Sequence, residues 1–179
     1  IYDGVWVGED SKIPNIGGIR RALVEAMREI KPGVVRWPGG CFADAYDWRD
    51  GIGPREKRPR RTNFWVDNRE WREVGLVPQK YEPNHFGTHE FIRFCRLIGA
   101  QPYIAANLRT LPASVFHQWI EYCNSPPGST TWAEVREANG DREPFNVRYW
   151  GVGNESWGCG GNVTPEEYCL LYTSDAADE

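Results

Sequence analysis

The chain has 179 residues, of which 40% are hydrophobic and 26% are charged, a composition typical of a folded globular domain rather than a disordered segment. Its formal net charge of -4 argues against a nucleic-acid partner, because nucleic-acid binding favours a basic surface. No apolar run approaches the roughly 20 residues of a membrane-spanning helix, so we expect no membrane partner.

Hydrophobic periodicity predicts that helices and strands alternate along the chain. We expect a short strand-like piece at residues 5–7 and buried strands at residues 34–37, 102–106 and 147–152. We expect helices at residues 19–30, 89–98, 111–123 and 132–138. Alternation of this kind predicts an α/β fold with a parallel sheet and right-handed connections.

A long polar stretch at residues 53–83 interrupts this alternation, and a loop of this length is usually functional. Five basic residues gather near its start: Arg55, Lys57, Arg58, Arg60 and Arg61. We expect them to form a solvated rim, because the chain is acidic overall and prolines are interleaved with them. Nucleic-acid binding by this cluster remains an alternative.

The five cysteines are widely scattered, and no two of them form a C-x-x-C pair. They are Cys41, Cys95, Cys123, Cys159 and Cys169. Their odd number and their spacing favour reduced thiols over a disulfide framework or a zinc ribbon. We therefore predict a cytoplasmic location.

An amide and a carboxylate, Asn154 and Glu155, follow the last expected strand and precede a run of glycines. In barrels of parallel strands and helices, reacting groups lie at the carboxyl ends of the strands. This pair suits sugar chemistry, because one side chain can bind a ring hydroxyl while the other transfers a proton. A turn that caps the next helix is the structural alternative. The nine Trp and eight Tyr fit a carbohydrate site or an aromatic core.

Four blocks of sequence resemble the α-L-arabinofuranosidases of glycoside hydrolase family 51, in that family's order. They are residues 36–44 (RWPGGCFAD), 48–54 (WRDGIGP), 84–91 (NHFGTHEF) and 149–161 (YWGVGNESWGCGG). The resemblance implies an incomplete (β/α)8 TIM barrel, comprising about strands 1–4. It also implies retaining hydrolysis of terminal α-L-arabinofuranosyl groups from arabinose-containing oligo- or polysaccharides of hemicellulose or pectin. No cofactor and no metal are implied, and the full-length enzyme is expected to be a homo-oligomer.

The resemblance also assigns roles to individual residues. Glu155 matches the general acid/base, and Asn154 matches the residue that binds the sugar 2-hydroxyl. Cys41 lies in a loop that lines the sugar subsite, where many relatives have Asn. Arg36 is a candidate charge partner inside the barrel, or a residue that ties strands together.

No nucleophile is assigned from the sequence, because the family carries it as a Glu on the seventh strand. Glu166 and Glu167 follow Thr164 and Pro165, a pattern that predicts a helix N-terminus capped by Thr164. We therefore interpret these glutamates as structural.

Three alternatives remain open. The first is a related retaining barrel glycosidase that acts on β-glucosides or xylosides. The second is a carbohydrate-binding module without catalysis, which the alternating pattern disfavours. The third is a metal site, in which His85 and His89, four residues apart, are joined by Cys41 or Cys159.

We expect residues 1–168 to form part of the catalytic domain. Residues 169–179 resemble the translation of a sequencing-library adapter and are expected to be a non-native tail on a fragment of an environmental enzyme gene. Half of a barrel leaves sheet edges unpaired. We therefore expect the fragment to be marginally folded and inactive alone.

Overall fold

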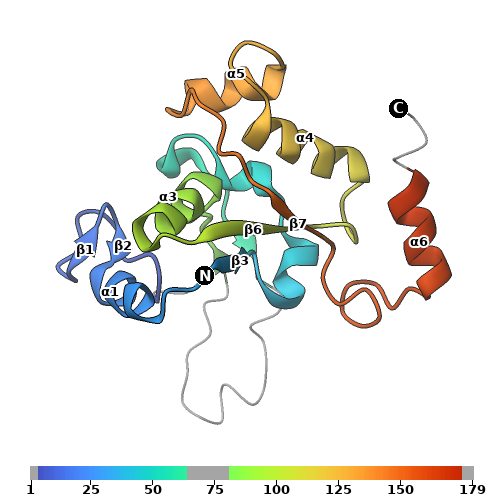
Figure 1. Cartoon of the computed structure of the whole chain (residues 1–179), viewed down its shortest axis with the longest axis horizontal. Helices are drawn as coiled ribbons and strands as arrows, with labels where there is room; N and C mark the ends of the chain where they lie inside the picture. The colour runs from blue at the N-terminus through green and yellow to red at the C-terminus, as the bar shows by residue number, and fades with distance from the viewer. Residues whose placement is uncertain (1–3, 64–80, 175–179) are drawn as a thin grey trace, which may run out of the picture. The chain divides into compact units, whose positions relative to one another are not determined.

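The computed structural model describes residues 4–63 and 81–174, which fall into two compact units (Figure 1). The first unit is built from the segments Ile1–Val35 and Trp48–Gln101, and the second from Arg36–Asp47 and Pro102–Glu179. Part of the long polar stretch expected at residues 53–83 lies outside the described residues. Among the described residues, no helix is long and apolar enough to cross a membrane.

The first unit begins with a two-stranded hairpin of β1 (Asn15–Ile16) and β2 (Ile19–Arg20), followed by α1 (Arg21–Ile30). The helix expected at residues 19–30 therefore starts two residues late, because Ile19 and Arg20 pair with β1. The strand expected at residues 5–7 is reduced to one bridge between Trp6 and Ile19. Only glycine fits at position 18, because an added Cβ would lie 2.2 Å from the Trp6 ring, which is too close for two carbon atoms.

The helices α1 and α3 (Thr88–Ile98) pack against each other in this unit (Figure 1). The predicted apolar face of α3 is buried, with Phe91, Phe94, Cys95 and Ile98 all at most 7% exposed. Gly99 ends the helix in the left-handed conformation that its sequence position predicts. Short elements complete the unit: 3-10 turns at Trp48–Gly51 and Arg55–Lys57, and a pairing of β4 (Arg61–Thr62) with β5 (Tyr81–Glu82).

The basic cluster is only partly the solvated rim that the sequence predicted. The side chains of Arg58 and Glu90 are each 4% exposed, and two hydrogen bonds of 3.1 Å join them. Arg55 adds a third bond of 3.0 Å to the same carboxylate. Lys57 and Arg60 are exposed as expected. The difference arises because Glu90, on α3, supplies a buried counter-charge 32 residues from Arg58.

The central sheet has the strand order β3 (Val34–Trp37), β6 (Gln101–Ala106) and β7 (Tyr149–Val152). β6 and β7 run parallel, with Tyr103 opposite Tyr149 and Ala106 opposite Val152. All three expected buried strands are therefore present, although the last begins at Tyr149 rather than Val147, and the parallel sheet is confirmed. β3 is less buried than predicted, because it stands at one end of this strand order.

Three helices among the described residues belong to the second unit: α4 (Ala113–Asn124), α5 (Thr131–Ala138) and α6 (Pro165–Ser174). α4 and α5 lie side by side (Figure 1). Trp119 of α4 is 1% exposed and packs edge-on against Trp37 and Trp150, at centroid distances of 6.0 and 6.1 Å. Much of the aromatic content therefore forms the core.

Candidate functional site

The loops that follow the three sheet strands are joined to one another by hydrogen bonds. Asn107, which directly follows β6, donates through Nδ2 to the Tyr46 carbonyl at 3.2 Å. Thr110 Oγ1 donates to the Asp44 carbonyl at 3.1 Å. Arg109 Nη1 donates to the Cys159 carbonyl at 2.7 Å. The loop after β6 thus holds the loops after β3 and β7 together in one cluster.

Asn107 makes several of the hydrogen bonds that connect these loops, and it was not identified as a site residue from the sequence. Its side chain is 5% exposed, and its Oδ1 accepts hydrogen bonds from the backbone N–H groups of Arg109 and Thr110, both at 3.0 Å. Nδ2 also donates to Thr110 Oγ1 at 2.7 Å. The signal that could have found Asn107 is its place directly after a buried strand.

Asn154 and Glu155 follow β7 directly, as the sequence predicted. Asn154 is 6% exposed, and its Oδ1 accepts a hydrogen bond from Arg36 Nη2. Arg36 therefore ties β3 to the end of β7, which was one of its two expected roles. Glu155 is exposed and adopts a left-handed backbone with φ of 44°, a conformation disfavoured for a residue with a side chain.

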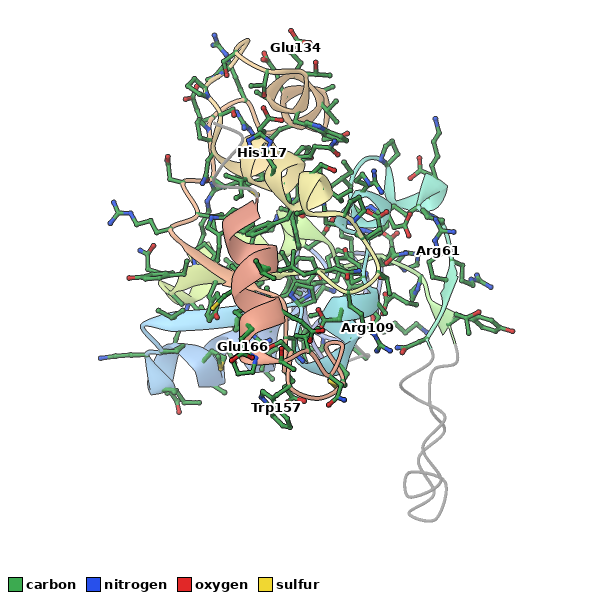
Figure 2. The ribbon with its side chains drawn as sticks, turned by 90° about the vertical axis from the view of Figure 1, so that its right-hand side faces the viewer. Arg61, Arg109, His117, Glu134, Trp157 and Glu166 are labelled. Atoms are coloured by element: carbon green, nitrogen blue, oxygen red, sulfur yellow. A yellow bond between two sulfur atoms is a disulfide. The ribbon has the colours of Figure 1, made fainter. Side chains whose placement is uncertain are left out.

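Tight turns after Glu155 fix its backbone. The Glu155 carbonyl accepts from the N–H groups of Gly158 at 2.7 Å and Gly160 at 3.0 Å. A Cβ at position 160 would lie 1.9 Å from the Asn154 carbonyl oxygen, so only glycine fits there. The glycine run is thus explained by close backbone packing around the amide and the carboxylate. Trp157, in the same loop, is 73% exposed and points away from the ribbon (Figure 2).

Cys41 and Cys159 form a disulfide, which contradicts the prediction that all cysteines are reduced thiols. The two residues are 118 positions apart in sequence, yet their Cα atoms are 5.7 Å apart because the loops after β3 and β7 adjoin. The positions of Cys41 and Cys159 in the sequence do not indicate that they are close in the fold. Cys95 and Cys123 are buried thiols outside the disulfide, and burial raises the pKa of Cys95 to about 12.

The disulfide touches the Glu155 carboxylate. Oε2 of Glu155 lies 3.3 Å from Sγ of Cys159 and 3.9 Å from Sγ of Cys41. The amide Nδ2 of Asn154 lies 3.7 Å from Sγ of Cys159. The structure therefore brings together all four site residues expected from the sequence, Arg36 through its bond to Asn154. In the oxidised form, Cys41 has no thiol proton to offer a ligand.

Asp44 is a second carboxylate among these loops that sequence analysis missed. It is 1% exposed, and burial raises its pKa. The backbone N–H groups of Leu108 and Asn154 oppose this rise, although neither carboxylate oxygen has a hydrogen bond of ordinary geometry among the described residues. Two nearby guanidinium groups, those of Arg109 and Arg36, also oppose it.

The histidine-based metal site is not supported. In residues 4–63 and 81–174, the one group of three potential ligands whose donor atoms lie within 4.8 Å of one another is Cys41, Glu155 and Cys159. His85 and His89 belong to no such group there. Burial and the neighbouring charges of Arg55 and Arg58 lower the pKa of His85.

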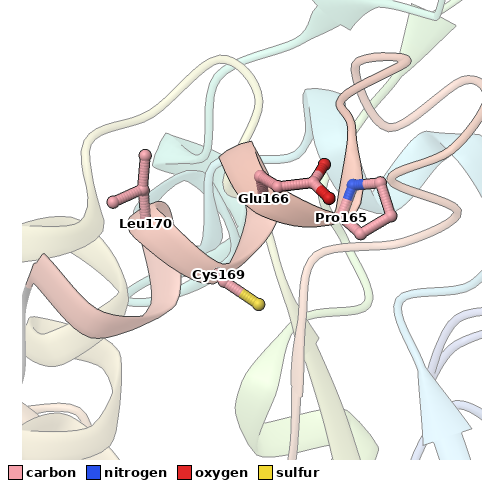
Figure 3. A pocket seen from close by; sticks show the side chains of 4 residues that line it. All are labelled: Pro165, Glu166, Cys169 and Leu170. Carbon is pink, nitrogen blue, oxygen red and sulfur yellow. The ribbon is translucent and has the colours of Figure 1, made fainter.

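The N-terminus of α6 has the predicted capping arrangement. Thr164 Oγ1 accepts from the Glu167 N–H at 3.2 Å, and the Glu167 carboxylate accepts from the Thr164 N–H at 2.7 Å. A hollow on this helix is lined by Pro165, Glu166, Cys169 and Leu170 (Figure 3). It contains none of the expected site residues, so Glu166 and Glu167 keep their structural interpretation.

Comparisons with known proteins point to one group of enzymes. Residues 26–169 match the family model described as the alpha-L-arabinofuranosidase 1 domain. The chain is 45% identical over 172 residues to an intracellular exo-alpha-L-arabinofuranosidase of Bacteroides ovatus, covering 96% of this chain and 31% of that protein.

Solved structures agree with this assignment. The GH51 arabinofuranosidase from Xanthomonas axonopodis pv. citri is 46% identical with a TM-score of 0.86, over 97% of this chain and 33% of that one. The arabinose complex of the Thermotoga maritima alpha-L-arabinofuranosidase is 40% identical with a TM-score of 0.84, over 97% of this chain and 34% of that one. The chain thus spans about a third of the length of these relatives.

Proposed function

Because this chain belongs to the α-L-arabinofuranosidases of glycoside hydrolase family 51, we propose that the protein carrying it is a retaining glycoside hydrolase. It releases terminal α-L-arabinofuranosyl residues from arabinose-containing oligo- or polysaccharides. The observation that carries this proposal is the Asn154–Glu155 pair at the carboxyl end of β7, braced by Arg36 and by the loop after β6. An exposed carboxylate on a rigid strand end suits proton transfer to a bound sugar.

Glu155 is the general acid/base in this proposal. It gives its proton to the glycosidic oxygen as the bond to the anomeric carbon breaks, and the ionised carboxylate then takes a proton from the attacking water. We assign no nucleophile among the described residues. The second carboxylate of the retaining mechanism lies about 5–5.5 Å from the acid in such enzymes.

Asn154 binds the sugar 2-hydroxyl in this proposal. Arg36 donates to Oδ1 of Asn154 and so fixes the orientation of the amide, which leaves Nδ2 as the donor for a ligand oxygen. Cys41, in the loop after β3, lines the same sugar subsite. Arg36 is therefore a positioning residue that acts through Asn154.

We further propose that residues 1–168 form part of a TIM-barrel catalytic domain, and that the full-length enzyme is a homo-oligomer of the cytoplasm. The intracellular relative from Bacteroides ovatus supports that location. Residues 169–179 are a non-native tail, although the boundary falls inside α6 (Pro165–Ser174). Independent nucleotide reads with continuous coding sequence across Cys169 would refute the tail assignment.

The test is hydrolysis by a protein of the relatives' full length that carries this chain, compared with its Glu155→Gln variant. On an arabinose oligosaccharide, whose leaving group needs protonation, we expect kcat/KM to fall about 10²–10⁴-fold. A nitrophenyl α-L-arabinofuranoside, with a good leaving group, should show a smaller loss in its glycosylation step. Glu166→Gln, an exposed carboxylate of α6, is the matched control and should keep its activity. Equal activity of the wild type and Glu155→Gln would overturn the proposal.

A further inference from the structure

The disulfide beside Glu155 raises the question of what these three residues do when the disulfide is reduced. Reducing compartments keep such cysteines as thiols. Reduction by a thiol or phosphine reductant adds two electrons and two protons and converts the Cys41–Cys159 bond into two thiols, while the reductant is oxidised. Both cysteines are half-buried and Glu155 is exposed, so the cluster is not enclosed in the core.

We propose that the reduced protein binds one thiophilic divalent cation, Zn²⁺ being the reference, through Cys41 Sγ, Cys159 Sγ and a carboxylate oxygen of Glu155. Two thiolates and one carboxylate form a donor set that zinc favours. Both thiols lose their protons as the cation binds, so the site forms with release of up to two protons. Solvent completes the fourth position, as in zinc sites with three protein ligands.

The distances already fit this coordination. Tetrahedral zinc with Zn–S of about 2.3 Å and Zn–O of about 2.0–2.2 Å places each sulfur about 3.5 Å from the carboxylate oxygen. The observed separations from Glu155 Oε2 are 3.3 Å to Cys159 Sγ and 3.9 Å to Cys41 Sγ, which lie on either side of this value. Only the two sulfurs must move apart, to about 3.8 Å, once the bond between them is broken.

Neighbouring groups support the same ligand positions. Asn154 Nδ2, 3.7 Å from Cys159 Sγ, can donate to a bound thiolate, and Arg109 holds the Cys159 carbonyl at 2.7 Å. Outer contacts of this kind orient metal ligands and tune their affinity. The whole cluster lies on loops fixed by the sheet strands, so little ordering is needed when the cation binds.

Cation binding would occupy the carboxylate that the proposed hydrolysis uses. The consequence for activity rests on the proposed function, because a zinc-bound Glu155 cannot carry a proton to the leaving group. Cation binding itself rests only on the three ligands. The two proposals therefore fail separately: binding can be tested without any sugar, and hydrolysis without any metal.

The experiment uses a protein of the relatives' full length that carries this chain, reduced anaerobically with a phosphine that is then removed. Titration with Co²⁺, followed by Zn²⁺ displacement, should show one equivalent bound with thiolate-to-cobalt absorption. The oxidised chain should show none. Cys41→Ser and Cys159→Ser should each weaken binding by at least about tenfold, and Glu155→Gln should also weaken it. Cys169→Ser, in α6, is the control and should bind as the wild type does.

A second measurement needs no variant. Zn²⁺ should protect two thiols of the reduced wild-type chain from alkylation, and mass spectrometry should map them to Cys41 and Cys159. Unprotected Cys41 and Cys159, or equal cobalt binding by the oxidised and reduced chains, would overturn the proposal. Unchanged binding by Cys41→Ser would do the same.

Discussion

At the scale of single residues, the environment of Glu155 depends on a glycine rather than on another polar group. An added Cβ at Gly160 would lie 1.9 Å from the Asn154 carbonyl oxygen, which is backbone and cannot turn aside. At Gly158, in the same loop, the nearest atom would be 3.7 Å away, an ordinary contact. The two glycines thus form a matched pair for testing how tightly this loop is packed.

We expect Gly160→Ala to lower the free energy of unfolding by about 1–3 kcal/mol, because the loop must shift to admit the methyl group. Gly158→Ala should change it by less than about 0.5 kcal/mol. Urea unfolding of both variants beside the wild type measures the difference. Equal stability of the two alanine variants would show that the loop adjusts freely.

Asp44 gives a second prediction, which concerns pH. Because burial raises its pKa in the folded protein, its contribution to stability is fully present below the ordinary Asp pKa of about 4 and is lost as pH rises through the folded value. The Asp44→Asn variant has no ionisable group at this position, so its unfolding free energy does not fall in this way as pH rises. The unfolding free energy of the variant minus that of the wild type should therefore increase with rising pH across this window. Urea unfolding at a series of pH values tests this, and a constant difference would contradict it.

At the scale of elements, the N-terminus of α3 depends on a buried ion pair. Burial alone would raise the pKa of Glu90, but hydrogen bonds and charge from Arg58, with the Gly87 N–H and Arg55, lower it below the usual range. Glu90→Gln leaves Arg58 buried without its counter-charge. We expect a loss of about 3–5 kcal/mol of unfolding free energy.

The control for this prediction is Glu137→Gln, which breaks an exposed pair with Arg142 whose charged atoms are 3.8 Å apart. Exposed pairs contribute about 0–1 kcal/mol, so this change should be small. The Glu90 contribution is present above the ordinary Glu pKa and is lost as pH falls through the lowered folded value. Urea unfolding at neutral and acidic pH measures both the effect of each substitution and its pH dependence. If Glu90→Gln lowered the unfolding free energy no more than Glu137→Gln does, the predicted contribution of the buried ion pair would be contradicted.

How far the sequence predicted these elements depended on the range of the interactions involved. The strands at 34–37, 102–106 and 147–152 and the end of α3 at Gly99 were predicted, because local composition and turn residues determine them. The disulfide, the Arg58–Glu90 pair and the position of Asp44 were not predicted. Each depends on residues far apart in sequence that meet only when the elements pack. Glu155 was identified because it follows its strand closely and lies within residues 149–161, a block that resembles the family 51 α-L-arabinofuranosidases.

At the scale of the whole molecule, the disulfide closes a long segment of the chain, since its two cysteines are 118 residues apart. Closing a loop of this size restricts the unfolded chain, so reduction should lower the unfolding free energy by about 2–4 kcal/mol. Urea unfolding with and without a metal-free phosphine measures the change. Cys41→Ser should reproduce it under oxidising conditions, whereas Cys169→Ser should not. An unchanged midpoint after complete reduction would contradict the prediction.

The bracing of the three strand-end loops has a consequence for substitutions in those loops. Asn107, Thr110 and Arg109 hold the neighbouring loops through main-chain carbonyls, not through the side chains of the residues they contact. Mutations that replace those side chains leave the acceptors in place. A substitution in one of the contacted loops can therefore change a side chain without removing the hydrogen bond that holds that loop in place.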